Sequence, residues 1–236
     1  MKFLVGLFLL YALAYSDLIF ACLPNEIHVR ESHIKEYRKQ SGVVVSSHVR
    51  SEHCREIKVN NYFENSPKDK IKGLETKFKD WTKDEMDQLI KQIESLPIWL
   101  KRYKLNKILR AAEQIGNSNN PAMVIPSART LIIFDKFFKM PNKKDIITHE
   151  MAHIAVWDMD PVVLKSFFVA RGWRYQEKGK IVAPDNVILP DSKNSPSEDF
   201  ANSIELYYSN KLLLQSFNPQ SFQILEKIIE SKESHK

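Results

Sequence analysis

Residues 146–155 read Ile-Ile-Thr-His-Glu-Met-Ala-His-Ile-Ala, and this stretch decides what we expect of the rest of the chain. It contains the pattern H-E-x-x-H, in which His149 and His153 stand four positions apart. On an α-helix such residues share one face, so both imidazoles would project in the same direction one turn apart. That spacing suits two ligands of a tetrahedral Zn²⁺. Glu150 would face the open coordination position and act as the general base that takes a proton from the metal-bound water.

The flanks of the motif fit a buried helix. Glu150 is the only charged residue between Ile146 and Ala155, and Pro141-Asn142 is a typical start signal. A short motif also has a plainer interpretation, a core helix with two hydrogen-bonded histidines and a partly exposed glutamate.

Length and composition indicate a globular protein. The 236 residues suit one domain plus a small appendage, and 43% apolar with 27% charged residues excludes a disordered chain. Lys and Arg (35) exceed Asp and Glu (29) by six. This mild basicity suits an extracytoplasmic protein near anionic surfaces, and we expect no nucleic-acid partner.

The N-terminus has the features of an export signal. Met1-Lys2 precedes an apolar run over residues 3–14 that is too short to span a bilayer. We expect residues 1–21 to be a removed signal peptide and the protein to be exported from a bacterial cell, into the periplasm, onto the envelope or into the medium. A cleavage site at 14–16 and a buried N-terminal helix are the alternatives.

The two cysteines leave two possibilities open. Residues 19–22 resemble a bacterial lipobox, in which Cys22 would carry a lipid anchor. Alternatively, Cys22 and Cys54 form a disulfide, as an even cysteine count suggests in an exported chain.

The segment 22–59 carries a short repeat. The sequence H-V-R-E-S-H at 28–33 returns as H-V-R-S-E-H at 48–53, and Gln40-Ser41-Gly42 between them predicts a turn before a strand at 42–49. We expect a basic, histidine-rich β-hairpin module. A second metal site, a polyanion-binding face and a merely solvated hairpin are its alternative interpretations.

After a polar linker predicted at 60–73, residues 74–236 should form the main domain. Thr82-x-x-Glu85 is a capping box that opens an amphipathic helix, and the apolar spacing at 105–112 predicts another helix. Strands are expected at 123–125 and 130–134, just before the motif helix. The second strand, just before the motif helix, is either the edge that pairs with a substrate or part of an ordinary structural hairpin. A last core helix is expected from Pro219.

A third metal ligand must come from further along the chain. Val156 and Met159 occupy the positions where one common zinc-protease class has glycine and histidine, and Trp173 stands where thermolysin-like enzymes have glutamate. The candidate we prefer is Glu198, although Ser195-x-x-Glu198 also predicts a capping box.

Two other acidic residues compete with Glu198 for the role of third ligand. Glu205 lies two turns further along the same predicted helix, and Glu177 lies in a polar loop.

The combination of His149-Glu150-x-x-His153 with Glu198-Asp199-Phe200-Ala201 resembles the catalytic domain of anthrax toxin lethal factor and the Pro-Pro endopeptidases, which are zinc peptidases. The resemblance covers about residues 130–210. It implies an α+β fold, a mostly helical zincin-like domain with a small β-sheet, preceded here by the hairpin module. It also implies that His149, His153 and Glu198 are the zinc ligands and that Glu150 is the base.

One position departs from the family's pattern. Asp191 stands where the family has a tyrosine that stabilises the oxyanion. Either Tyr207, Tyr208 or Tyr175 replaces it, or the metal alone holds the oxyanion.

We therefore expect an exported endopeptidase that binds one Zn²⁺ and hydrolyses polypeptide substrates through a zinc-activated water. A non-enzymatic envelope-binding protein with a structural zinc, and a metallo-amidase acting on cell-wall peptides, are the alternatives. A lipid anchor or the basic module would provide envelope association. The sequence leaves the substrate sequence and the oligomeric state open.

Overall fold

The computed structural model describes residues 26–29, 32–38, 44–51, 53–56, 62–65, 76–112, 120–176 and 180–234. The chain forms two compact units, residues 1–58 with Lys236, and residues 59–235. The predicted signal peptide, the Cys22 pairing or lipidation, the turn at 40–42 and the ligand candidate Glu177 lie outside the described residues. Among the helices that are described, none is long and apolar enough to cross a membrane.

The first unit contains a β-hairpin built from three antiparallel strand pairs. They are β1 (Glu26–Val29) with β6 (His53–Glu56), β2 (Ser32–Ile34) with β5 (His48–Arg50), and β3 (Tyr37–Arg38) with β4 (Val44–Val45). All three pairs share one register. From Glu26↔Glu56 to Arg38↔Val44, each step forward on the first strand is matched by one step back on the second. The predicted hairpin is confirmed, and the two copies of the repeat lie on opposite strands.

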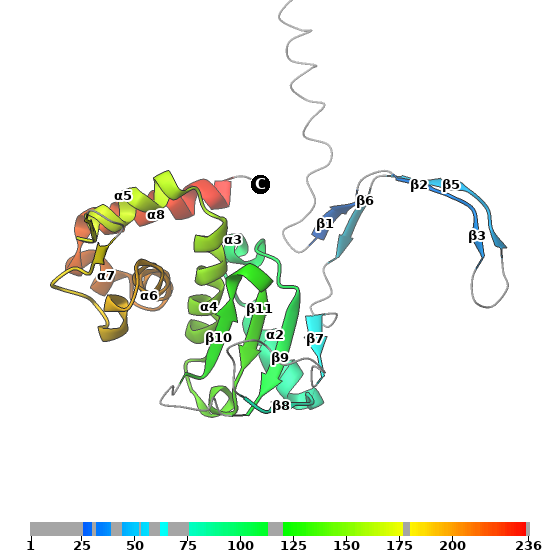
Figure 1. Ribbon diagram of the computed structural model, residues 1–236, viewed down its shortest axis with the longest axis horizontal. Helices are drawn as coiled ribbons and strands as arrows, with labels where there is room; N and C mark the ends of the chain where they lie inside the picture. The colour runs from blue at the N-terminus through cyan, green and yellow to red at the C-terminus, as the bar shows by residue number, and fades with distance from the viewer. Residues whose placement is uncertain are drawn as a thin grey trace, which may run out of the picture. The chain divides into compact units, whose positions relative to one another are not determined.

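The second unit contains a five-stranded mixed sheet (Figure 1). Its strands are β7 (Phe63–Glu64), β8 (Phe78–Lys79), β9 (Lys107–Ala111), β10 (Ala122–Ile125) and β11 (Thr130–Ile133). The order is β10-β11-β9-β7, and β8 pairs with the last residues of β9. β10 runs antiparallel to β11, while β11 and β7 run parallel to β9. β10 is therefore an edge strand.

Two sequence predictions fail in this sheet. The helix predicted at 105–112 is instead strand β9, whose residues after Lys107 are all buried. A strand that is buried on both faces lacks the apolar–polar alternation, and the spacing of its apolar residues can then match that of a helix. The linker predicted at 60–73 contains β7, because Phe63 and Glu64 pair with Ile108 and Leu109.

In the view of Figure 1 the helices lie behind and beside the sheet, and the C-terminal ones form a separate layer beyond it. The α-helices are α2 (Lys83–Glu94), α3 (Ile98–Lys101), α4 (Lys143–Asp158), α5 (Pro161–Ala170), α6 (Pro196–Ser209), α7 (Lys211–Phe217) and α8 (Pro219–Ser234). Short 3₁₀ turns occur at η3 (Pro126–Ala128), η4 (Asp135–Lys139) and η6 (Pro190–Lys193), and a small ladder joins β12 (Arg174–Tyr175) to β13 (Ile181–Val182). The α+β class with a mostly helical main domain is confirmed.

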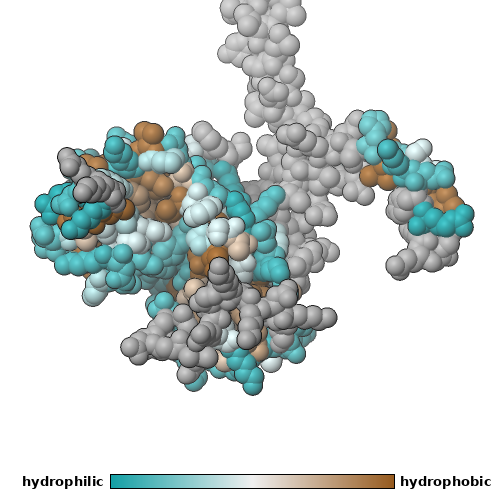
Figure 2. Space-filling view, in the orientation of Figure 1, coloured by the Kyte–Doolittle hydropathy of each residue, from teal (hydrophilic) through white to brown (hydrophobic). Residues whose placement is uncertain are grey.

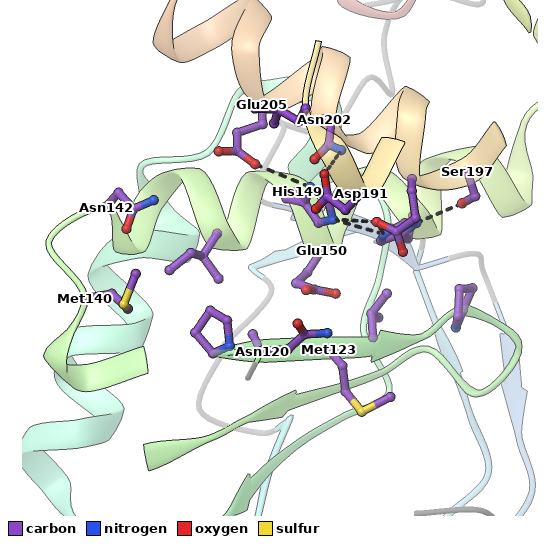
Figure 3. A pocket seen from close by; sticks show the side chains of 18 residues that line it. Asn120, Met123, Met140, Asn142, His149, Glu150, Asp191, Ser197, Asn202 and Glu205 are labelled. Carbon is purple, nitrogen blue, oxygen red and sulfur yellow. Dashed lines mark hydrogen bonds and ion pairs between the residues drawn. The ribbon is translucent and has the colours of Figure 1, made fainter. Parts of the chain in front are cut away.

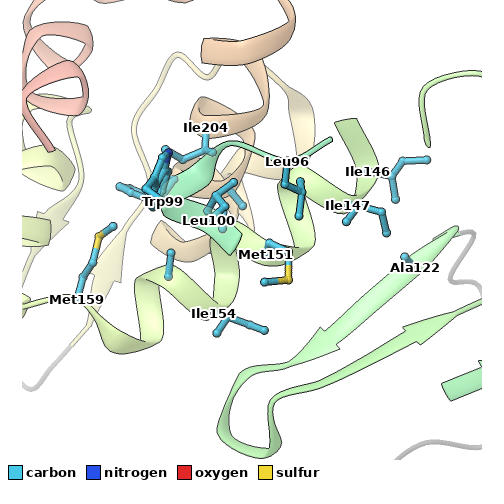
Figure 4. Close-up of a cluster of buried hydrophobic side chains, with 14 of the residues drawn as sticks. Leu96, Trp99, Leu100, Ala122, Ile146, Ile147, Met151, Ile154, Met159 and Ile204 are labelled. Atoms are coloured by element: carbon cyan, nitrogen blue, oxygen red, sulfur yellow. The ribbon is translucent and has the colours of Figure 1, made fainter. Parts of the chain in front are cut away.

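Helix α4 is the central element of this unit. It packs against β10 on one side and α6 on the other. Side chains from α3, α4 and α6 meet in one core, where Trp99, Leu100, Ile147 and Ile204 are almost completely buried (Figure 4). This packing fixes α4 between the sheet and the C-terminal helices. Side chains that project from α4 between these two contacts are therefore held in defined positions.

Most of the surface seen in Figure 2 is hydrophilic, with apolar side chains scattered over it. The exposed large apolar residues include Trp157 at the end of α4 and Val162 and Val169 on α5. Single exposed apolar residues are normal for a soluble domain.

Candidate metal centre

Helix α4 brings the H-E-x-x-H residues to the wall of a cavity. The helix runs from Lys143 to Asp158, and most of its residues from Ile146 to Ala155 are buried. His149 and His153 project from one face, with 15% and 12% of their side chains exposed. The helix predicted from residues 146–155 is confirmed, and so is the shared face of its two histidines.

Helix α6 supplies the third group. Pro196 occupies its first position, and the Ser195 hydroxyl accepts a hydrogen bond from the Glu198 backbone N–H at 3.1 Å. The Glu198 carboxylate does not close a capping box. Its Oε2 lies 3.3 Å from His149 Nε2 and 3.5 Å from His153 Nε2. The structure therefore places this side chain with the histidines.

The three atoms form a triangle of the size that a zinc ion requires. The third side, His149 Nε2 to His153 Nε2, measures 3.2 Å. Ligands at about 2.0–2.1 Å from a tetrahedral Zn²⁺ lie roughly 3.3–3.4 Å from one another. The observed separations of 3.2, 3.3 and 3.5 Å match one face of that tetrahedron. Among the residues that the structure describes, this is the group of His, Cys, Asp and Glu side chains close enough to hold a metal ion.

A second contact orients each histidine. His153 Nδ1 lies 2.8 Å from the Ser197 hydroxyl, and His149 Nδ1 lies 3.3 Å from Glu205 Oε2 (Figure 3). A proton on each Nδ1 leaves the Nε2 lone pair directed into the triangle. Such outer contacts fix the tautomer and ring orientation of metal-binding histidines. Glu205 thus contacts Nδ1 of His149, whereas Glu198 contacts Nε2, on the side of the ring that faces the triangle.

The electrostatics of the cluster favour positive charge. Burial alone lowers the pKa of His149, but hydrogen bonds to the carboxylates of Glu198 and Glu205 raise it to about 10. The same hydrogen bonds with His149 and His153 hold the pKa of Glu198 far below its ordinary range. Carboxylates that stabilise a proton on an imidazole also stabilise a cation that replaces the proton.

Glu150 lies across the cavity from these carboxylates, between α4 and strand β10. Its side chain points toward β10 (Figure 3), and the backbone N–H of Val124 is directed at its carboxylate. Only 9% of the residue is exposed, and burial raises its pKa. A raised pKa makes a carboxylate a better proton acceptor near neutral pH.

The cavity itself has a volume of about 490 Å³. One wall is β10 with Ala122, Met123 and Val124, and the opposite wall comes from α4 and α6. The strand edge of β10 that does not pair with β11 faces this space. Sequence reasoning expected this edge in the strand just before the motif helix, but that strand is β11, which lies between β10 and β9, and the edge strand is β10.

The tyrosines proposed as oxyanion stabilisers lie elsewhere. Tyr208 accepts a hydrogen bond from Trp99 Nε1 at 2.7 Å, and Tyr207 stacks on Phe222. Neither lines the cavity, and neither does Tyr175, which is half exposed in β12. Both α6 tyrosines turn toward the C-terminal helices because they belong to the apolar side of α6.

The position that departs from the family pattern is at the site. Asp191 lines the cavity, and its Oδ1 accepts a hydrogen bond from Asn202 Nδ2 at 2.9 Å. Asn202 also donates to the Ser192 hydroxyl at 2.9 Å, which ties η6 to α6. Sequence reasoning missed Ser197 and Asn202. Their only signal was helical spacing, since Asn202 lies one turn after Glu198.

No protein-family model matches the chain, and no curated protein that was compared with it matches either.

Proposed function

We propose that this protein is a zinc-dependent endopeptidase whose catalytic centre is the His149, His153 and Glu198 triangle beside Glu150. The observation that carries the proposal is the size of the triangle, because its three sides fit one face of a tetrahedral zinc site. Within the described residues three protein ligands cluster here, which leaves a fourth coordination position open, as a catalytic site requires.

A zinc ion held there would polarise a substrate carbonyl and make a bound water acidic. The remaining steps belong to the chain's own residues. Glu150, buried and with a raised pKa, accepts the proton of the attacking water and delivers it to the departing amine nitrogen. Ser197 and Glu205 hold the two imidazoles in one orientation throughout.

The edge of β10 that does not pair with β11, where the Val124 N–H is directed at Glu150, supports a polypeptide as the substrate. An extended chain laid along this edge gains main-chain hydrogen bonds without any demand on its side chains. Those bonds would hold the scissile carbonyl between the triangle and Glu150. A metallo-amidase would use the same triangle, but the strand edge favours an extended peptide over a branched cell-wall fragment.

A closed structural zinc site has weaker support. Structural sites use four protein ligands. Within the described residues, the cluster supplies three, and Glu205 contacts the wrong nitrogen of His149 to serve as the fourth.

The test replaces Glu150 by glutamine, which keeps the shape of the side chain but removes the proton acceptor. We expect Glu150→Gln to retain zinc, measured by metal analysis after dialysis, and to cleave a degenerate peptide pool at least ~10²-fold more slowly. Glu230→Gln, on the exposed face of α8, is the matched control and should behave like the parent protein. Equal cleavage by Glu150→Gln and the parent would refute the mechanism. Purified protein that holds no zinc and cleaves no peptide would refute the function.

A further inference from the structure

The cavity carries the opposite charge from the chain as a whole. Lys and Arg outnumber Asp and Glu by 35 to 29 in the sequence. The described residues that line the cavity nevertheless include four carboxylates and neither a lysine nor an arginine. The carboxylates are Glu150, Asp191, Glu198 and Glu205.

A bound metal would neutralise only part of this charge. With both histidines neutral, the two charges of Zn²⁺ balance Glu198 and Glu150. Asp191 and Glu205 remain, and in the described part of the chain neither forms an ion pair with a lysine or arginine. Lys143, at the start of α4, donates to the Met140 carbonyl and does not line the cavity.

The two remaining carboxylates are held in place. Asn202 donates to Asp191 Oδ1, and His149 Nδ1 holds Glu205 Oε2. In Figure 3 both acidic side chains lie on the α6 side of His149, whereas Ser197 lies at the other end of the cavity.

We propose that the substrate carries a lysine or arginine side chain next to the scissile bond and that Asp191 and Glu205 bind its cationic group. This inference rests on the proposed peptidase function and names its substrate class. Met140, Ile146 and Leu189 line the same cavity and offer apolar contact to the methylene stem of such a side chain.

The physical reason is electrostatic complementarity. A cleft lined by one sign of charge attracts the opposite sign and repels its own. An acidic substrate side chain would meet two uncompensated carboxylates. A neutral side chain can donate a hydrogen bond to them but leaves their charge unbalanced. Only a cation completes the charge balance that the metal leaves unfinished.

The experiment compares two peptides that differ by one group. A degenerate peptide pool is digested first, and the preferred sequence is then made with arginine, or with its neutral isostere citrulline, beside the cut. We expect kcat/KM to be at least about 10-fold higher for the arginine peptide. Raising the ionic strength from about 0.05 to 0.5 M should reduce that ratio, because salt screens exposed charges.

Asp191→Asn tests the assigned residue. Asparagine keeps the acceptor for Asn202 but loses the charge, and we expect the arginine-to-citrulline ratio to fall to about 3 or less. Because both peptides meet the same enzyme, any effect on zinc cancels in the ratio. Asp185→Asn, an exposed acidic residue outside this cavity, should keep the parent ratio.

The outcomes separate this inference from the proposed function. Cleavage that is absent from every pool overturns the proposed function. Cleavage that depends on Glu150 but shows an arginine-to-citrulline ratio near one overturns only the substrate class, and so does an unchanged ratio in Asp191→Asn.

Discussion

Two helices of this protein begin with the same sequence pattern and use it differently. At α2, Thr82-x-x-Glu85 forms both bonds of a capping box, because the Glu85 N–H donates to Thr82 Oγ1 at 3.3 Å and the Thr82 N–H donates to Glu85 Oε2 at 3.1 Å. At α6, Ser195 accepts from the Glu198 N–H, but the Glu198 carboxylate lies with the two histidines.

The difference separates a structural glutamate from a functional one. A cap contributes about 1 kcal/mol, so a side chain leaves it only where another partner offers more. Two buried imidazoles that share a carboxylate, with the pKa of His149 raised to about 10, are such a partner. The first turn of α6 therefore needs other support, which Asp199 provides.

The largest effect should follow removal of Glu198. Glu198→Ala leaves two histidines, and we expect zinc to be lost on dialysis together with peptidase activity. The loss of affinity should exceed the ~10–100-fold that removal of an outer-shell partner costs. Competition titration with a chelator measures it. The melting temperature of the variant should no longer respond to chelator, because no holo form exists.

Glu85→Ala is the matched change at α2. It should leave the zinc affinity at the parent value and lower only the free energy of unfolding. If Glu198→Ala kept stoichiometric zinc and Glu205→Ala lost it, the third ligand would be Glu205, two turns further along α6, and our assignment would be wrong.

How much of this site the sequence predicts depends on how local each feature is. The H-E-x-x-H helix and the start of α6 are local patterns, and the structure confirms both. The choice between cap and ligand for Glu198 is not local, because both interpretations share one spacing. It depends on the distance between α6 and α4, which only the fold sets.

The same reason explains the failures. β9 was mistaken for a helix because a strand that is buried on both faces loses its polar alternation. Tyr207 and Tyr208 lie on α6 as expected, but their direction depends on Trp99 and Phe222, which are distant in sequence. No spacing rule predicts which nitrogen of His149 faces Glu205.

The next largest effect should come from Asp199, which anchors the first turn of α6, where the capping box is not closed. Its carboxylate pairs with Arg171 and accepts from Trp173 Nε1 at 2.9 Å, and both side chains of the ion pair are completely buried. Asp199→Ala leaves the Arg171 charge buried and alone, so we expect a loss of about 3–5 kcal/mol in the free energy of unfolding. Denaturant titration measures it.

The surface pair Arg129–Asp158 provides the control for this loss. It is partly exposed, so Asp158→Ala should cost no more than about 1 kcal/mol. Equal losses in Asp199→Ala and Asp158→Ala would show that the buried pair does not anchor α6.

A smaller effect is expected from the residues behind the histidines. Glu205→Ala and Ser197→Ala each remove one acceptor from an Nδ1, and we expect zinc affinity to fall by about 10–100-fold in each. Because Glu205 is charged and Ser197 is not, the loss should be larger in Glu205→Ala. Isothermal titration against a zinc buffer ranks the two. Parent affinity in both variants would mean that neither contact orients its ring.

The smallest effect is expected at the complete capping box of α2. It is also the sharpest test of the comparison between Glu85 and Glu198. Glu85 also accepts from Arg110 Nε at 3.0 Å and Nη2 at 2.8 Å. Burial raises the pKa of Glu85, but the hydrogen bonds from Arg110 and Thr82 outweigh burial and lower it. A carboxylate with a lowered folded pKa stabilises the protein above its unfolded pKa, near 4.3, and the gain disappears as the pH falls through the folded value.

Glu85→Gln keeps a residue that can close the box but removes the charge that faces Arg110. We expect it to cost about 1 kcal/mol at pH 7 and nothing measurable well below pH 4, where Glu85 of the parent protein is itself protonated. Glu85→Ala removes the cap as well, so its cost should persist at low pH. Unfolding free energies of the three proteins between about pH 3 and 7 decide this. A cost for Glu85→Gln that does not change with pH would show that Glu85 acts at α2 as a cap alone, without any contribution from its charge.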